Sequence, residues 1–206
     1  MKHPAVLMLF LAACAPAAAP LKGVLAPDRS LPSLSMPGGH RHIVFKWDYQ
    51  EGDIAARGDG SIRTAAPDSA RLDFFLGGGL GGGGAILIGD SLRAPHADLA
   101  RRYIPPTPLM WAALSRLAIP PLPDTVVRID GAITRADIGR PLQWRLAIKG
   151  DTLIELEHIK DGKITESLTR DPNGTLTFQV PGARRTLRLS IVREQPGSFD
   201  ASIWSL

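Results

Sequence analysis

The chain has 206 residues, with 24 lysines and arginines against 20 aspartates and glutamates, which gives a formal net charge of +4. This length suffices for one domain with its own core and is short for two. The basic residues are scattered and form no dense patch interleaved with aromatic residues, so the composition excludes a typical nucleic-acid-binding protein. With 21 glycines, 18 prolines and 6% aromatic residues, the chain is typical of a turn-rich β protein.

The N-terminus has the organisation of an export signal. Lys2 and His3 give it a positive start, and residues 5–13 form an apolar run that is too short to span a bilayer. We therefore expect residues 1–13 to be a cleaved signal peptide. Cys14 follows the run directly and is the only cysteine of the chain, so no internal disulfide can form.

The sequence LAAC at residues 11–14 resembles the lipobox of bacterial lipoproteins. This resemblance implies that Cys14 is acylated, becomes the mature N-terminus and anchors the protein in a membrane. An ordinary signal peptide with an incidental cysteine is the alternative. Because Ala15 stands where an aspartate is associated with inner-membrane retention, the resemblance implies the outer membrane, with the domain facing the periplasm.

Residues 14–40 are rich in alanine, proline and serine and show no periodicity. Prolines keep such a segment extended, at up to ~3.3 Å per residue. The segment is therefore predicted to be a lipid-anchored tether that holds a single domain, residues 41–206, tens of Å away from the membrane.

Alternation of apolar and polar residues predicts that most of this domain is β-strand. In the first strand, Ile43, Phe45 and Trp47 share one face. Strands are expected at residues 43–50, 54–76 (two strands hinged at Pro67-Asp68), 85–88, 125–130, 132–138, 142–148, 153–159, 163–169, 175–180, 186–193 and 199–203. Gly58 and Gly60 lie inside a strand, where glycine predicts a bend or a group packed close against the sheet.

Helical spacing occurs once, between residues 98 and 119. The apolar positions from Leu109 onward recur at helical intervals, and Thr107 followed by Pro108 predicts a capped helix start. The helix is expected to continue to the proline pair that begins at Pro120.

These elements predict a mainly β fold, in which a curved antiparallel sheet of about 11–13 strands forms a half-barrel covered by one main helix. The concave side of such a sheet is a natural cavity for an apolar ligand. The residues expected to line it are Phe45, Trp47, Ala56, Ile62, Leu72, Phe74, Leu109, Trp111, Trp144 and Leu146.

Three segments resemble the LolA/LolB superfamily of lipoprotein carriers and receptors, most closely its lipid-anchored member LolB. They are the run ARGDGSIRTAAPDSARLDFFL at residues 56–76, the segment from Pro108 to Pro120 with its tryptophan, and Leu80 within the glycine run 77–84. The resemblance covers residues 43–204. It implies non-covalent binding of lipid or lipoprotein acyl chains for transfer to the outer membrane, with Leu80 contacting the membrane and a soluble periplasmic carrier as a further partner.

Two other interpretations remain open. Gly89-Asp90-Ser91-Leu92 has the GDSL signature of a serine esterase family, in which Ser91 is the nucleophile. The glycine-x-asparagine-aspartate and aspartate-x-x-histidine blocks of that family do not occur in this chain, so we expect a hairpin turn at this point and no enzyme, cofactor or metal. The other interpretation is a structural envelope lipoprotein with a packed interior.

Overall fold

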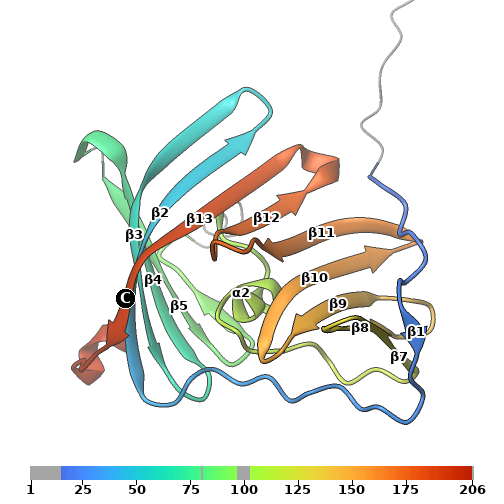
Figure 1. Ribbon diagram of the computed structural model, residues 1–206. Helices are drawn as coiled ribbons and strands as arrows, with labels where there is room; N and C mark the ends of the chain where they lie inside the picture. Colours follow the sequence, from blue (N-terminus) through green and yellow to red (C-terminus); the bar gives the residue numbers. More distant parts are fainter. Residues whose placement is uncertain (1–14, 80, 97–102, 206) are drawn as a thin grey trace, which may run out of the picture.

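The structure is a computed structural model that describes residues 15–79, 81–96 and 103–205. Thirteen strands within these residues form one antiparallel sheet, in the order β1-β7-β8-β9-β10-β11-β12-β13-β2-β3-β4-β5-β6. The sheet curls around one α-helix without closing, which confirms the predicted half-barrel (Figure 1). The strands are β1 (Val24–Leu25), β2 (His40–Glu51), β3 (Ile54–Ala65), β4 (Ser69–Leu76), β5 (Gly82–Ile88), β6 (Ser91–Arg93), β7 (Thr125–Asp130), β8 (Ile133–Ile138), β9 (Trp144–Lys149), β10 (Thr152–Lys160), β11 (Lys163–Arg170), β12 (Leu176–Val180) and β13 (Arg185–Pro196).

The aromatic residues of β2 lie flat against the glycines of β3. Phe45 pairs with Gly60 and Trp47 pairs with Gly58 in the antiparallel register. A Cβ atom at Gly60 would lie 2.2 Å from Cζ of Phe45, and one at Gly58 would lie 3.1 Å from Cε2 of Trp47. The Trp47 indole also donates a hydrogen bond to the Asp59 carbonyl, at 2.9 Å. The expectation that something packs closely on these glycines is therefore confirmed.

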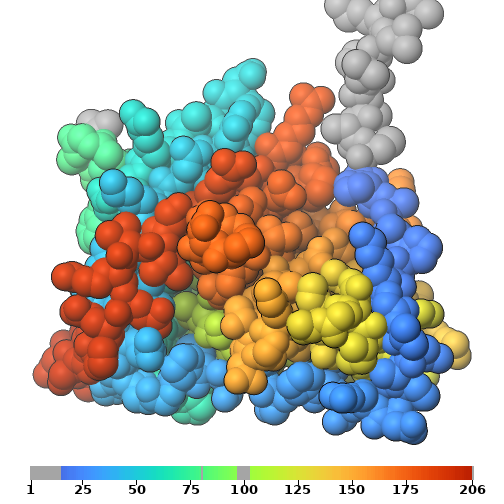
Figure 2. Space-filling model, in the orientation of Figure 1, coloured from blue at the N-terminus to red at the C-terminus, as the bar shows by residue number. Residues whose placement is uncertain are grey.

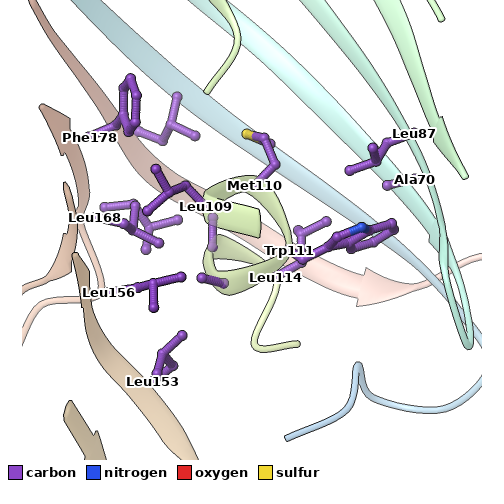
Figure 3. Packing of buried hydrophobic residues seen from close by; sticks show 14 of the residues in the cluster. Ala70, Leu87, Leu109, Met110, Trp111, Leu114, Leu153, Leu156, Leu168 and Phe178 are labelled. Carbon is purple, nitrogen blue, oxygen red and sulfur yellow. The ribbon is translucent and has the colours of Figure 1, made fainter. Parts of the chain in front are cut away.

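The helix α2 (Thr107–Ala113) fills the middle of the half-barrel instead of only covering it. Leu109, Met110 and Trp111 are almost completely buried. Figure 3 shows Leu109 directed toward Leu168 and Phe178 on one wall, and Trp111 directed toward Ala70 and Leu87 on the other. The helix therefore joins the two walls into one core.

Two hydrogen bonds connect this helix to other elements and hold it in place. Nε1 of Trp111 donates to the carbonyl of Gly89 in the β5–β6 turn, at 2.7 Å. Nη2 of Arg170 on β11 donates to the carbonyl of Ala113, the last helical residue, at 2.8 Å. Burial lowers the pKa of the Arg170 guanidinium below its ordinary value. The first bond connects the helix to the β5–β6 turn and the second connects it to β11, so the helix is attached to both walls.

The helix is shorter than expected. It begins at Thr107, with Pro106 as the N-cap and without a side-chain cap, and it ends at Ala113, well before the proline pair. Ser115 has a positive φ of 63°, which an α-helix does not accommodate. The amide of Leu117 is bonded to the carbonyl of Leu34, 3.1 Å away, so the chain after α2 pairs with another segment.

The C-terminal segment is the one expected strand that is wrong. Residues 199–203 do not add to the sheet, because the Asp200 carboxylate accepts a hydrogen bond from the amide of Ser202 and starts the 3-10 turn η3 (Ala201–Trp204). Nη1 of Arg71 on β4 donates to the carbonyl of Ile203, at 2.8 Å. The segment is thus fixed to the polar face of the sheet. The other 3-10 turns are η1 (Gly77–Gly79) and η2 (Pro181–Ala183).

The described part of the expected tether, residues 15–39, lies against the domain. It contributes the short edge strand β1, and its residues Leu34 and Met36 are buried in the core. In Figure 1 this segment, in blue, follows β7 and then crosses one end of the half-barrel. The prediction of an extended tether is therefore wrong for these residues, because composition does not reveal that the few large apolar side chains among the prolines fit the core.

Candidate functional site

The two ends of the half-barrel are formed by different sets of turns. Because neighbouring strands are antiparallel, the turns at residues 52–53, 77–81, 139–143, 161–162 and 181–184 lie at one end, which we call the cavity end. The turns at residues 66–68, 89–90, 131–132, 150–151 and 171–175 lie at the opposite end.

A cavity of about 590 Å³ opens at the cavity end, between the strands β2 to β5 and the segment that leads into α2. Its wall is made largely of aromatic and aliphatic side chains and of the glycine backbone at the start of β5. None of the described lining residues is Asp, Glu, Lys or Arg. The apolar lining residues are Trp47, Tyr49, Ala56, Phe74, Leu76, Ala94, Pro95, Tyr103, Ile104 and Leu187.

The aromatic side chains of the wall support one another. The ring of Phe74 lies edge-on to those of Phe45 and Trp47, with ring centroids 5.4 and 5.9 Å away. On the other side, the Tyr49 and Tyr103 rings have centroids 4.8 Å apart. Such edge-to-face pairs stabilise an aromatic cluster beyond the burial of its area. The wall of the cavity is therefore preformed.

Two of the polar side chains of the wall bond to protein groups outside the cavity. The Trp47 indole donates to the backbone of β3, and the Tyr49 hydroxyl donates to Oε2 of Glu51, at 2.8 Å. Glu51 is in turn paired with Arg185, with Oε1 2.7 Å from Nη2. These groups point their polar ends at protein partners, so the surface that they offer to the cavity is apolar.

Glycines 82, 83 and 84 leave one part of the wall without side chains. Gly83 pairs with Phe74 in the register of β4 and β5, and therefore lies on the inner face of the sheet. A Cβ atom at Gly83 would meet no atom within 4 Å. The glycine run thus makes room in the cavity, which its composition alone does not show.

The structure separates the ten residues expected to line the cavity into two groups. Trp47, Ala56 and Phe74 line it. The others are buried in the core and are not part of the lining: Phe45, Ile62, Leu72, Leu109, Trp111, Trp144 and Leu146. The reason is that α2 occupies the middle of the half-barrel, so inward-facing residues near it contact the helix. The open space of the cavity lies beside the segment that leads into α2.

Several lining residues were missed. Tyr49, Leu76 and Leu187 lie on the inward face of strands that were predicted, so alternation was a usable signal for them. Tyr103 and Ile104 come from the segment before α2, and the helical spacing of this region does not show that these two residues face the cavity. Cys14 and Leu80, expected to be the lipid anchor and the membrane contact, lie outside the described residues.

Ser91 has the surroundings of a hairpin residue, as the sequence predicts. It is exposed and pairs with Ile88 across the Gly89-Asp90 turn. A second hollow of about 460 Å³ lies beside this turn, but Ser91 lines neither it nor the larger cavity. The carbonyl of Gly89 accepts the hydrogen bond from Trp111, so the Gly89-Asp90 turn helps to hold α2 in place.

The described part of the chain holds neither a candidate metal site nor a candidate membrane span. No group of three or more His, Cys, Asp and Glu residues among residues 15–79, 81–96 and 103–205 is arranged to hold a metal ion. Within the same ranges, no helix has the length and apolar character needed to cross a membrane.

No protein-family model matches the chain, and no curated protein matches it in sequence. Solved structures do match. A LolA superfamily protein from Nitrosomonas europaea is 7% identical, with 84% of this chain and 92% of that one covered at a TM-score of 0.53. A DUF1329 family protein from Desulfovibrio piger (10% identical, 82% and 90% covered, TM-score 0.42) and a putative outer membrane lipoprotein-sorting protein domain from Vibrio parahaemolyticus (6%, 80% and 89%, 0.47) are also similar. The first of these likenesses shows that the chain shares its fold with a LolA superfamily protein.

Proposed function

We propose that this protein is a lipid-anchored, periplasm-facing lipoprotein of the LolB type, which binds one acyl chain non-covalently in the cavity and delivers it to the outer membrane. The observation that carries the proposal is the preformed, largely apolar cavity, whose described lining residues include no Asp, Glu, Lys or Arg. Such a wall offers burial to an alkyl chain. The shared fold with a LolA superfamily protein agrees with a carrier role.

The size of the cavity limits the ligand. One water molecule occupies about 30 Å³ of liquid and a methylene group is of similar size, so 590 Å³ holds roughly 20 such groups. This suits a single long acyl chain and is too small for several chains at once. We therefore infer that only one chain of a multiply acylated ligand is held inside, while the rest of the ligand stays at the mouth.

Filling the cavity is expected to abolish this binding. In Gly83→Trp the indole would project into the space that the alkyl chain needs, so we expect the affinity for 11-(dansylamino)undecanoic acid to fall by about tenfold or more. Dansyl fluorescence on titration of the soluble mature domain measures this affinity. Trp47, which lines the cavity, is a better intrinsic reporter than the fully buried Trp111.

Gly182→Trp is the matched control for this experiment. Gly182 lies in a turn at the same end, is exposed, and its Cβ would also meet no atom within 4 Å, but it is not part of the cavity. This variant should bind the probe like the wild type. Equal affinity in Gly83→Trp, or no binding by the wild type, would contradict the proposal and favour the structural envelope lipoprotein.

The lipid anchor is tested separately. Cys14→Ser removes the only thiol of the chain, so we expect the variant to carry no acyl group and to leave the membrane fraction. Intact-protein mass spectrometry and membrane flotation measure the two effects. A variant that still floats entirely with membranes would show that residues 15–206, and not an acyl group on Cys14, hold the protein there.

A further inference from the structure

Successive residues of the N-terminal segment form hydrogen bonds with the sheet. The amide of Ala18 donates to the carbonyl of Gly162 (2.9 Å), and the amide of Ile164 donates to the carbonyl of Pro16 (3.0 Å). Two arginine side chains hold the next residues: Nη1 of Arg145 donates to the carbonyl of Ala19 (2.5 Å), and Nη1 of Arg128 donates to the carbonyl of Gly23 (2.9 Å). Figure 2 shows the segment, in blue, lying against the yellow and orange surface of the sheet. We call residues 16–26 the strap.

The fit of the strap is close at Gly23. This residue has a φ of +96°, and a Cβ atom there would lie 2.6 Å from the carbonyl oxygen of Ile129. Glycine is thus required both for the backbone conformation and for the approach to β7. Val24 and Leu25 then pair with Ile129 and Arg128 as strand β1. These contacts fix the path of the strap.

The strap begins at the cavity end. Pro16 and Ala18 are bonded beside the β10–β11 turn at residues 161–162, which belongs to that end of the half-barrel. If Cys14 is the anchor, only one residue, Ala15, separates it from the first bonded residue. At ~3.3–3.6 Å per residue, this connection, which we call the leash, keeps the β10–β11 turn, at one side of the cavity end, within about 10 Å of the anchoring point. An extended tether from residue 14 to residue 40 would instead permit every orientation.

The cavity end carries apolar side chains that are open to solvent. Ile54 is 47% exposed, Phe75 53%, Leu76 39% and Tyr103 38%. Leu76 and Tyr103 also line the cavity, so this apolar rim is continuous with its mouth. Contacts of this kind with lipid are individually weak, but they reinforce an acyl anchor that already holds the protein at the surface.

The charges at the two ends differ in sign. Among the exposed charged residues in and beside the turns of the cavity end, Arg140, Lys160, Lys163 and Arg184 are basic and Asp53, Asp124 and Asp161 are acidic, so this set carries a net charge of +1 (4 − 3). Those at the opposite end are mostly acidic, namely Asp90, Asp151 and Asp171 beside Lys149. An anionic lipid surface would attract the first end and repel the second.

We propose that the strap fixes the orientation of the anchored protein, so that the apolar rim and the cavity mouth rest on an anionic lipid bilayer. The inference rests on the lipid anchor and the cavity of the proposed function, and it adds the surface that meets the membrane. Because the strap is attached to the sheet, an anchor at the N-terminus restricts the orientation of the domain relative to the membrane. A ligand chain then passes between cavity and bilayer without crossing open water.

The test couples the mature chain from Cys14 to maleimide lipid through its only thiol, in phosphatidylcholine vesicles with about 30% phosphatidylglycerol. An environment-sensitive fluorescent amino acid replaces Asp53 at the cavity end or Asp151 at the opposite end. Spin-labelled lipid should quench the probe at residue 53 at least about threefold more than the probe at residue 151, because quenching requires close approach. Equal quenching at both positions would overturn the proposal.

Two variants separate the strap from the anchor. A flexible insertion of about 20 Gly and Ser residues between Ala15 and Pro16 leaves every strap contact in place but lengthens the leash. Gly23→Val combined with Ala18→Pro removes the fit at Ile129 and the donor to Gly162. We expect both to reduce the difference between the two probes, and an undiminished difference in the insertion variant would contradict the role of the short leash.

Failure of this inference is distinguishable from failure of the proposed function. Binding of 11-(dansylamino)undecanoic acid is measured in solution without vesicles and does not depend on orientation. If the protein binds the fatty acid but both probes are quenched equally, the carrier function is supported and the proposed orientation on the membrane is contradicted. If the doubly substituted variant does not fold, as judged by circular dichroism, the insertion variant alone decides the matter.

Discussion

Replacing Gly60 by valine is expected to lower the free energy of unfolding by about 3 kcal/mol or more, which is at the upper end of overpacking effects. The first added carbon would lie 2.2 Å from Cζ and 2.6 Å from Cε2 of Phe45, and 2.9 Å from the carbonyl oxygen of Asp73. Phe45 is only 1% exposed, so its ring has nowhere to move. Either β2 and β3 must separate or the ring must leave the core. Urea denaturation followed by circular dichroism measures the loss.

Gly83→Val is the control for this prediction. Gly83 is also a strand glycine, but its Cβ would meet no atom within 4 Å. Valine is favoured over glycine in strands, so this variant should be as stable as the wild type or slightly more stable. Equal losses at residues 60 and 83 would show that glycine is needed for backbone freedom and not for the approach of Phe45.

Trp111→Ala is expected to destabilise the protein by about 3–5 kcal/mol, the range for removing a fully buried large aromatic side chain. Trp111 is 0% exposed and its ring fills the space between α2 and the wall that carries Ala70 and Leu87 (Figure 3). The Arg116 guanidinium also lies over the ring, with Cζ 4.7 Å from its centroid. Thermal unfolding measured by calorimetry should show a markedly lower midpoint.

Trp111→Phe separates the hydrogen bond from the packing. It retains most of the ring but leaves the carbonyl of Gly89 without the donor that lies 2.7 Å away, so a smaller loss of about 1–3 kcal/mol is expected. If the phenylalanine variant were as unstable as the alanine variant, the indole–carbonyl bond would be the main attachment of α2. If both were harmless, the helix would not be part of the core that the structure shows.

The fold was predictable because its strands alternate. Residues such as Trp144 and Leu146 face inward in every second position, and turns with glycine at residues 131, 150, 162 and 174 mark the strand ends. Alternation reports only which face of the sheet a side chain occupies. The two-residue strand β1 and the three-residue strand β6 are too short to show any period, so they were not foreseen.

The site was only partly predictable, because inward-facing is not the same as cavity-lining. Trp47 and Phe45 occupy equivalent positions on one face of β2, yet Trp47 borders the cavity and Phe45 is enclosed. The difference is set by the position of α2 and of the segment that precedes it, and by the glycines of β5, which contribute no side chain. Both are properties of the assembled domain, which the local propensities of the sequence do not predict.

The pairing of β1 with β7 has a consequence for the edge of the sheet. A chain shortened to the expected domain boundary at residue 41 would lose Val24 and Leu25 and leave the outer edge of β7, which carries the half-exposed Val126, without a partner strand. An unpaired edge strand is a template for strand addition by a second copy. Where many anchored copies crowd on one surface, the proline-rich segment therefore also protects the domain from edge-to-edge aggregation.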